Sequence, residues 1–168
     1  MAGLSGQLRA AGMTRRADIT GRNLSRLEAV YRLQVGRVYT LCLLLLADAR
    51  LAEEATARVF ARFGREPSRQ PGEERLLELA AEESVESLGA SEAADETAAA
   101  LAGLDALVAR LPGSPRAAFV LHDIEGMSAA AVARYMHVDE DAARLLVGEA
   151  RGALRRMGLG RGRGEHNR

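Results

Sequence analysis

The side chains that most often carry out chemistry in proteins are sparse in this sequence. It contains 3 histidines and 1 cysteine, and none of the histidines has a cysteine or a second histidine at the spacing of a metal site. A Glu-x-x-His pair, which builds di-metal sites in helical bundles, is also missing. The sequence has no glycine-rich phosphate loop and no nucleophile with a suitable base. We therefore expect neither an enzyme nor a bound metal or cofactor.

Arginines near the C-terminus are the side chains best suited to bind a ligand. They share one predicted helix, and they are Arg144, Arg151, Arg155 and Arg156. Guanidinium groups bind DNA phosphates, so this set is the predicted DNA-binding site. The same helix begins with Asp139-Glu140-Asp141. These acids favour the positive end of the helix dipole and oppose a phosphate backbone, so the expected affinity for DNA is weak.

The elements that must position these arginines are predicted to be helices. Ala, Leu, Arg and Glu dominate the sequence and are strong helix formers, so the predicted fold class is all-α. Ser128 is expected to cap a short helix, and Asp139 to cap the last one. Between them, His137-Val138 should form a tight turn in which His137 takes the left-handed conformation. Two helices joined by such a turn are the layout of a helix-turn-helix, whose second helix lies in the major groove.

The apolar spacing predicts two small helical domains. In the first, helices over 27–45 and 51–63 are joined by Ala47–Arg50 as an antiparallel hairpin, and a third helix begins near Glu73. The predicted parts of the chain are a flexible arm (1–22), a helical domain (23–90), an acidic linker (91–97), a helix-turn-helix domain (98–158) and a Gly/Arg tail (159–168).

The second domain is expected to begin with one amphipathic helix over Ala98–Leu111, stopped by Pro112-Gly113. Ser114 is then expected to cap a helix that buries Phe119 and ends at Gly126 in a left-handed C-cap. Just before that glycine, Asp123 and Glu125 are expected to serve only in capping and solvation.

Charge is unevenly distributed along the chain. The formal net charge is zero, with 23 basic and 23 acidic residues, and every basic residue is an arginine. Residues 66–110 carry 11 acids against 3 arginines, while residues 111–168 carry 9 arginines against 7 acids. A domain that binds nucleic acid is usually clearly basic, which again indicates weak binding of DNA.

The single cysteine, Cys42, lies in an apolar run and is predicted to be a buried thiol in a reducing compartment. That run, Leu41–Leu46, is too short to span a bilayer, and the N-terminal arginines are not followed by the apolar stretch of a signal peptide. We expect a cytoplasmic protein that does not associate with a membrane.

The C-terminal half has Leu111-Pro112, then Arg116, an apolar stretch and Glu125-Gly126 shortly before Ser128. This order resembles the fourth region of extracytoplasmic-function sigma factors. In that family Leu-Pro is followed by an arginine, an aliphatic stretch, and then Glu-Gly shortly before a serine. This sequence has the same residues in the same order, namely Leu111-Pro112, Arg116, Phe119-Val120-Leu121, Glu125-Gly126 and Ser128. Ala133 and Val138 continue the pattern.

The N-terminal half is similar to the second region of the same family. The matching residues are Val38-Tyr39, Asp48 between two helices, Ala52-Glu53-Glu54 and Val59-Phe60. Together the two resemblances cover residues 27–63 and 101–157.

The resemblance implies a role in transcription initiation. The N-terminal helices would bind core RNA polymerase through Asp48, Glu53 and Glu54 and open the downstream promoter element, while the helix-turn-helix would read the upstream element. The implied partners are core RNA polymerase, promoter DNA bound weakly or not at all, and an anti-sigma factor.

The departures from the family pattern fall on these functions. The family's usual Gln-Glu is replaced by Ala57-Arg58, which puts polymerase affinity in doubt. The helix that should hold melted DNA is usually rich in Trp, Arg and Asn, but the stretch Glu73–Glu83 has five carboxylates and no aromatic ring. We interpret this stretch as the acidic, solvated face of an ordinary packing helix. On the recognition helix, Leu145, Leu146 and Gly148-Glu149 replace residues that are usually Ser, Arg or Lys.

Two functions therefore remain open. The chain could be a divergent sigma factor that still directs polymerase to promoters. It could instead be a sigma-like protein-interaction module that keeps the fold and has lost promoter opening.

Overall fold

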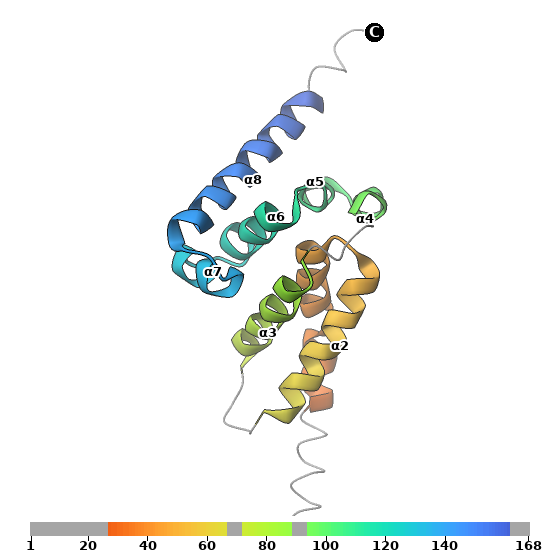
Figure 1. Cartoon of the computed structure of the whole chain (residues 1–168). Helices are drawn as coiled ribbons and strands as arrows, with labels where there is room; N and C mark the ends of the chain where they lie inside the picture. The colour runs from red at the N-terminus through yellow and green to blue at the C-terminus, as the bar shows by residue number, and fades with distance from the viewer. Residues whose placement is uncertain (1–26, 67–71, 89–93, 162–168) are drawn as a thin grey trace, which may run out of the picture. The chain divides into compact units, whose positions relative to one another are not determined.

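The computed structural model of the chain describes residues 27–66, 72–88 and 94–161 (Figure 1). All regular secondary structure in these ranges is helical, which confirms the all-α class. The predicted arm, 1–22, and residues 162–168 of the predicted tail lie outside the described residues. A helix over Leu27–Leu46 comes first. It is followed by α2 (Ala49–Arg65), α3 (Glu73–Glu86), α4 (Ala94–Ala100), α5 (Gly103–Ala109), α6 (Gly113–Phe119), the π-helical turn η1 (Val120–Ile124), α7 (Ala129–Met136) and α8 (Glu140–Arg161).

The chain divides into two compact units, Met1–Val35 and Gly36–Arg168. In the first unit the described residues, 27–35, are helical. The second unit holds the rest of that helix and every labelled helix from α2 to α8. The division into two domains at a linker over 91–97 stays a prediction, but residues from Ala94 onward belong to helix α4 and are not an extended linker.

The Leu27–Leu46 helix and α2 follow each other with only Ala47 and Asp48 between them, as the predicted hairpin requires. Ala47 takes a left-handed backbone conformation with a φ of 50°. Asp48 then caps α2, because its Oδ1 accepts a hydrogen bond from the Leu51 N–H at 3.0 Å. Helix α3 packs against α2. The largest fully buried side chains of these three helices are Val38, Leu41, Leu45, Leu46, Val59, Leu76 and Leu79.

The Leu27–Leu46 helix has the length and composition of a membrane span, with 20 residues and a mean hydropathy of 1.3 in its most apolar window. A buried helix of a globular core meets the same test, so this is weak support for a membrane. Its C-terminal half is buried within the second unit. Cys42 lies in this half as a buried free thiol, as predicted, and burial raises its pKa.

The single helix expected over Ala98–Leu111 is in fact two helices, α4 and α5. The chain breaks at Leu101–Ala102, and Gly103 begins α5 with a φ of +62°, which glycine adopts without strain. Leu104 is 53% exposed, so it does not belong to the buried face that the sequence spacing suggested. Instead, the buried residues Ala98 and Ala109 cluster with Ala47 at the turn of the N-terminal hairpin.

Helix α6 and the turn η1 bury Phe119, whose exposed fraction is 9%, as predicted. Gly126 ends this segment with a φ of +71°, also as predicted. The expected cap by Ser114 is wrong, because α6 begins at Gly113 after Pro112 and no side chain caps it.

Candidate nucleic-acid interface

Helices α7 and α8 form the predicted helix-turn-helix, and local side-chain chemistry fixes each of its ends. The Ser128 Oγ accepts a hydrogen bond from the Ala131 N–H at 3.2 Å and caps α7. His137 takes the left-handed conformation, with φ 55° and ψ 40°, and ends α7. The Asp139 Oδ1 accepts from the Ala142 N–H at 2.7 Å and caps α8. All three predictions for this motif are confirmed.

Helix α8 packs against both α6 and α7 (Figure 1). Its buried face consists of Ala143, Val147 and Ala150, whose small side chains allow the helices to approach closely. Val132 of α7 is fully buried as well. The opposite face of α8 is therefore left to meet a ligand, and all four arginines predicted to bind DNA lie on this helix.

Arg151 is already held by a carboxylate, that of Asp123. The Nε of Arg151 donates to Oδ2 of Asp123 at 2.8 Å, and its Nη2 donates to Oδ1 at 2.5 Å. These hydrogen bonds hold the pKa of Asp123 below its usual range against the opposing effect of burial, and they raise the pKa of Arg151. Asp123 was expected to serve only in capping and solvation, but it links η1 to α8 through this bidentate pair.

Arg144 is paired with the acids of its own helix. Its Nη1 lies 2.9 Å from Oδ1 of Asp141, and its Nη2 contacts the carboxylate of Glu140. The side chain of Arg144 is nevertheless 57% exposed. Exposed pairs of this kind contribute little to stability and can be exchanged for another anion.

Arg155 and Arg156 are exposed, and neither forms an ion pair with a carboxylate among the described residues. Their guanidinium groups lie near the backbone of Gly152, since a Cβ placed there would be 3.4 Å from Nη1 of Arg156. Among the residues of α8 whose side chains the structure describes, these two are the cations that a phosphate could meet without displacing a carboxylate.

Between the two ends of α8, its exposed face carries an apolar side chain at a position where DNA-binding helices usually carry polar ones. Leu145 is 69% exposed, and the neighbouring Gly148 and Glu149 are exposed too. Leu145 and Gly148 offer no polar side-chain atom to a base edge, and Glu149 can only accept a hydrogen bond, as from the amino group of cytosine. The geometry therefore suits backbone contact better than base readout.

The residues predicted to bind polymerase lie in or next to α2, away from α8 in sequence. Asp48 is 6% exposed and serves as the cap of α2, so it offers little surface to a partner. Glu53 is exposed. Glu54 is half-exposed and accepts a hydrogen bond from Arg50 at 2.6 Å, a pair one helical turn apart. Glu53 and Glu54 thus remain available at the surface, and their contact with polymerase stays a prediction.

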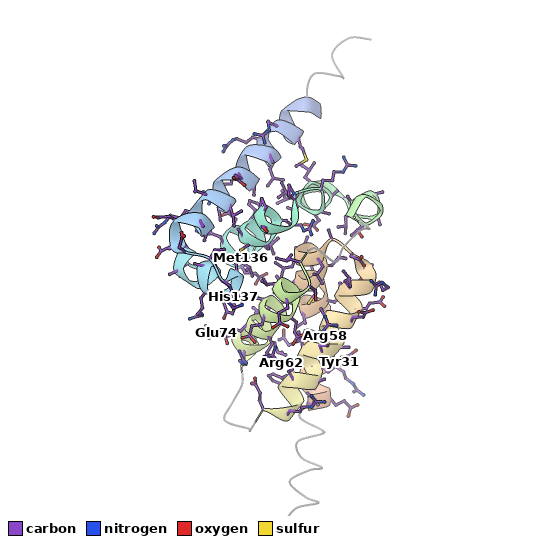
Figure 2. The ribbon with its side chains drawn as sticks, viewed as in Figure 1. Tyr31, Arg58, Arg62, Glu74, Met136 and His137 are labelled. Atoms are coloured by element: carbon purple, nitrogen blue, oxygen red, sulfur yellow. The ribbon has the colours of Figure 1, made fainter. Side chains whose placement is uncertain are left out.

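Helix α3 is not a simple solvated acidic face. Glu83 is buried, with its side chain 8% exposed, and it accepts hydrogen bonds from Arg58 at 2.9 Å and from Arg62 at 2.7 Å. Both arginines belong to α2 and are labelled in Figure 2. Burial alone would raise the pKa of Glu83, but the two arginines outweigh it and hold that pKa below its usual range. Arg62 also bonds Glu82 at 2.8 Å. Sequence reasoning missed this network because its partners lie 20 to 25 residues apart.

Arg116 is the least expected polar residue of the structure, because it is 4% exposed and faces no carboxylate among the described residues. Its guanidinium donates to the carbonyls of Leu45 and Leu46 at 3.0 Å each, at the C-terminal end of the first helix. It also donates to the carbonyls of Ala109 at 3.2 Å and Leu111 at 2.9 Å, at the end of α5. Two helix C-termini with unpaired carbonyls thus share one cation.

Burial lowers the pKa of Arg116 to about 10, so the guanidinium remains charged at neutral pH. The sequence signal for this role is an arginine that directly precedes the apolar stretch Ala117–Leu121.

Comparison with protein families identifies one segment. Residues 101–154 match the family model described as Sigma-70, region 4. The match covers about a third of the 168-residue chain and includes α5, α6, α7 and most of α8. It supports a protein of the sigma-70 type, in which the fourth region is a DNA-binding helix-turn-helix used in transcription initiation. No curated protein matches the chain.

Proposed function

We propose that this chain is a sigma-70-type factor of the extracytoplasmic-function kind, which binds core RNA polymerase and directs it to promoter DNA. The proposal rests on one observation, namely that a family match and a structural motif fall on the same residues. The residues that match sigma-70 region 4, 101–154, also hold a helix-turn-helix whose two helices are capped and whose turn takes the left-handed conformation. The resemblance of residues 27–63 to the second region of that family supports the polymerase-binding half.

Promoter DNA is bound through α8, and Arg155 and Arg156 make the first contacts. They are exposed and form no carboxylate pair among the described residues, so phosphate binding displaces nothing. Arg144 and Arg151 contact DNA only after phosphate has replaced the carboxylates with which they are now paired. Phosphate contacts release counterions, so the affinity is weak and falls steeply with salt.

Core polymerase is bound through the outer face of α2. Glu53 and Glu54 are exposed there, while Asp48 acts indirectly by holding the first turn of the helix through its cap. In this role Asp48 is a positioning residue, because its carboxylate is turned toward the backbone of Leu51.

A second function is favoured by α3, namely a sigma-like interaction module that has lost promoter opening. Melted DNA is captured by aromatic stacking and by cations. Helix α3 has no aromatic residue, and Glu82 and Glu83 are bound to Arg62 of α2. On this alternative the helix-turn-helix keeps its fold and serves as a protein surface.

Proteins with a region 4 domain are transcription factors and not enzymes, and they act in the cytoplasm. We propose the same class and compartment for this chain, with an anti-sigma factor as a further partner. Its apolar surface suits such a partner, because Leu145 is exposed on α8.

The first experiment is a pull-down of the full chain with core polymerase, followed by transcription from promoters upstream of its own gene. Association together with specific transcription supports the sigma factor. Association without transcription supports the interaction module. Failure to associate contradicts the sigma factor and leaves only an interaction module whose partner is not polymerase.

A DNA titration at low and moderate salt tests the interface itself. Glu140→Gln with Asp141→Asn should strengthen binding, because these acids repel phosphate and now pair with Arg144. Asp139 is kept, since it caps α8. Arg155→Ala with Arg156→Ala should abolish most of the affinity, whereas Arg144→Ala with Arg151→Ala should weaken it less, because these two arginines are already paired with carboxylates. No measurable affinity even for the neutralised variant contradicts the sigma-factor mechanism and leaves the module.

A further inference from the structure

The outer face of α8 lies opposite the buried residues of that helix, which are Ala143, Val147 and Ala150. Its residues follow one another at alternating steps of four and three, and they are Asp141, Leu145, Gly148, Gly152 and Arg155, with Arg156 beside the last. All of them are exposed except Gly152, which is half-buried. Such steps keep residues on one stripe of a helix, and helices that pair side by side use the same spacing.

The shape of the outer face is a projection next to a notch. Leu145 projects, with 69% of its surface exposed. Gly148 and Gly152 form the notch. A Cβ added at Gly148 would meet nothing within 4 Å, and one added at Gly152 would meet only the flexible ends of Arg156 and Arg155. Since the distance between paired helices depends on the side chains at the contact, a second backbone can approach closely at this notch.

The charges at the two ends of the outer face have opposite signs. Asp141 lies at the N-terminal end, and its contact with Arg144 leaves its side chain 90% exposed. Arg155 and Arg156 lie at the C-terminal end and form no ion pair with a carboxylate among the described residues. A parallel second copy of α8 would bring like charges together, whereas an antiparallel copy brings opposite charges together and also aligns the helix dipoles favourably.

We propose that the outer face of α8 is the interface of a homodimer, in which α8 of a second copy lies antiparallel along it. With the two-fold axis beside Gly148, Leu145 of each copy packs into the notch of the other, and Asp141 of each copy faces Arg155 of the other. Such an interface is self-complementary, because each contact occurs twice. Glu149 flanks the axis at the edge of the interface, where solvent screens its charge.

The size of the interface sets the strength of the dimer. From Asp141 to Arg156 the helix extends for about 22 Å. Stable interfaces bury about 1,200–2,000 Å², which is more than two helices of this length can cover. We therefore expect a dimer in exchange with the monomer, with a Kd of about 10–100 μM.

The dimer goes beyond the proposed function and does not depend on it. Only one consequence rests on that function. Arg155 and Arg156 face the second copy in the dimer, so DNA and the second copy compete for the same arginines.

The first test measures self-association of the full chain by sedimentation velocity over a range of about 1–300 μM, with neither DNA nor polymerase present. Leu145→Gln should weaken the dimer at least about tenfold, because it removes the apolar side chain that fills each notch. The matched control is Leu104→Gln on α5, where the leucine is 53% exposed, and it should change the association less than about twofold.

Gly148→Gln fills the notch and keeps the two backbones apart, so it should also weaken the dimer at least about tenfold. Glutamine is a better helix former than glycine, so the same variant should raise the Tm of the monomer. Loss of the dimer together with a higher Tm shows that the interface was lost and the fold was kept.

The second test exchanges the charges. Asp141→Arg alone and Arg155→Asp alone should each weaken the dimer roughly three- to tenfold, because each brings like charges together. The two changes in one chain should restore it, since Arg at 141 then faces Asp at 155 of the second copy. A parallel pair would not be restored, because each end would again meet its own charge.

The outcomes decide the proposal and leave the proposed function separate. A chain that stays monomeric at the highest concentration overturns the dimer, whatever other protein Leu145 contacts. Self-association that Leu145→Gln and Gly148→Gln leave unchanged also overturns it, because the interface then lies elsewhere. Failure of the double charge exchange to restore association overturns the antiparallel pairing. None of these results bears on the proposed function, while a chain that dimerises as described and binds no DNA contradicts that function alone.

Discussion

Replacing Arg116 by Met should destabilise the protein strongly, although Met fills much of the same space. The substitution removes a guanidinium that donates four hydrogen bonds to main-chain carbonyls. The carbonyls of Leu45, Leu46, Ala109 and Leu111 would then lose their side-chain donor at two helix ends. No nearby lysine or arginine among the described residues takes part in this cluster.

The size of the loss follows from two opposing effects. Burial lowers the pKa of Arg116 from its usual range to about 10, which corresponds to about 3 kcal/mol of desolvation. Hydrogen bonds from a charged donor contribute about 1.5–3 kcal/mol each, so four of them exceed that penalty. Four such hydrogen bonds at the lower end of that range, less the desolvation penalty that is removed with the charge, give an expected loss of about 3–5 kcal/mol.

The assay is urea and thermal unfolding followed by circular dichroism. A loss of that size should lower Tm by about 6–20 °C in a chain of this length. The unfolding free energy of Arg116→Lys should lie between those of the unchanged protein and of Arg116→Met. An ammonium keeps the charge, but it cannot span four acceptors. The matched control is Arg110→Met, an exposed arginine near the end of α5, which should change the unfolding free energy by less than about 0.5 kcal/mol. Equal stabilities of Arg116→Met and Arg110→Met would refute the reasoning.

Three further predictions concern acid stability, packing and DNA. The pKa of Glu83 is lowered in the folded state, so its contribution is present above its unfolded pKa, about 4, and is lost as pH falls below that value. Glu83→Gln should therefore lower the unfolding free energy by about 1–3 kcal/mol at neutral pH and flatten its decline between about pH 5 and 3 in urea titrations. Phe119→Ala should cost about 3–5 kcal/mol in the same assay, because the ring is 9% exposed, and a change within error would mean that the ring is not packed. Arg155→Ala with Arg156→Ala should reduce the slope of log affinity for DNA against log salt by about two, and an unchanged slope would place the phosphate contacts elsewhere.

The helix-turn-helix could be predicted from the sequence because the contacts that fix its ends are made within a few residues. Ser128 and Asp139 cap helices through their own neighbouring N–H groups, and His137 ends α7 within the same few residues. The break that divides α4 from α5 could not be predicted in this way. Leu104 keeps helical spacing with the apolar residues around it, and only its exposure in the folded chain shows that the spacing is accidental.

The sequence by itself determined the helical class, the position of the DNA-reading helix and the acidity of α3, because these depend on residue type and on contacts within one or two turns. Tertiary structure decided which charged side chains are paired within the protein and which remain available to a ligand. Arg151 looked like a phosphate contact until η1 brought Asp123 to it, and the buried pairing of Glu83 depends on α2 and α3 packing side by side. Arg116 is the clearest case, since its acceptors are main-chain carbonyls up to 71 residues away. Every residue carries such a carbonyl, so no side-chain pattern can mark the ones that a buried guanidinium will find.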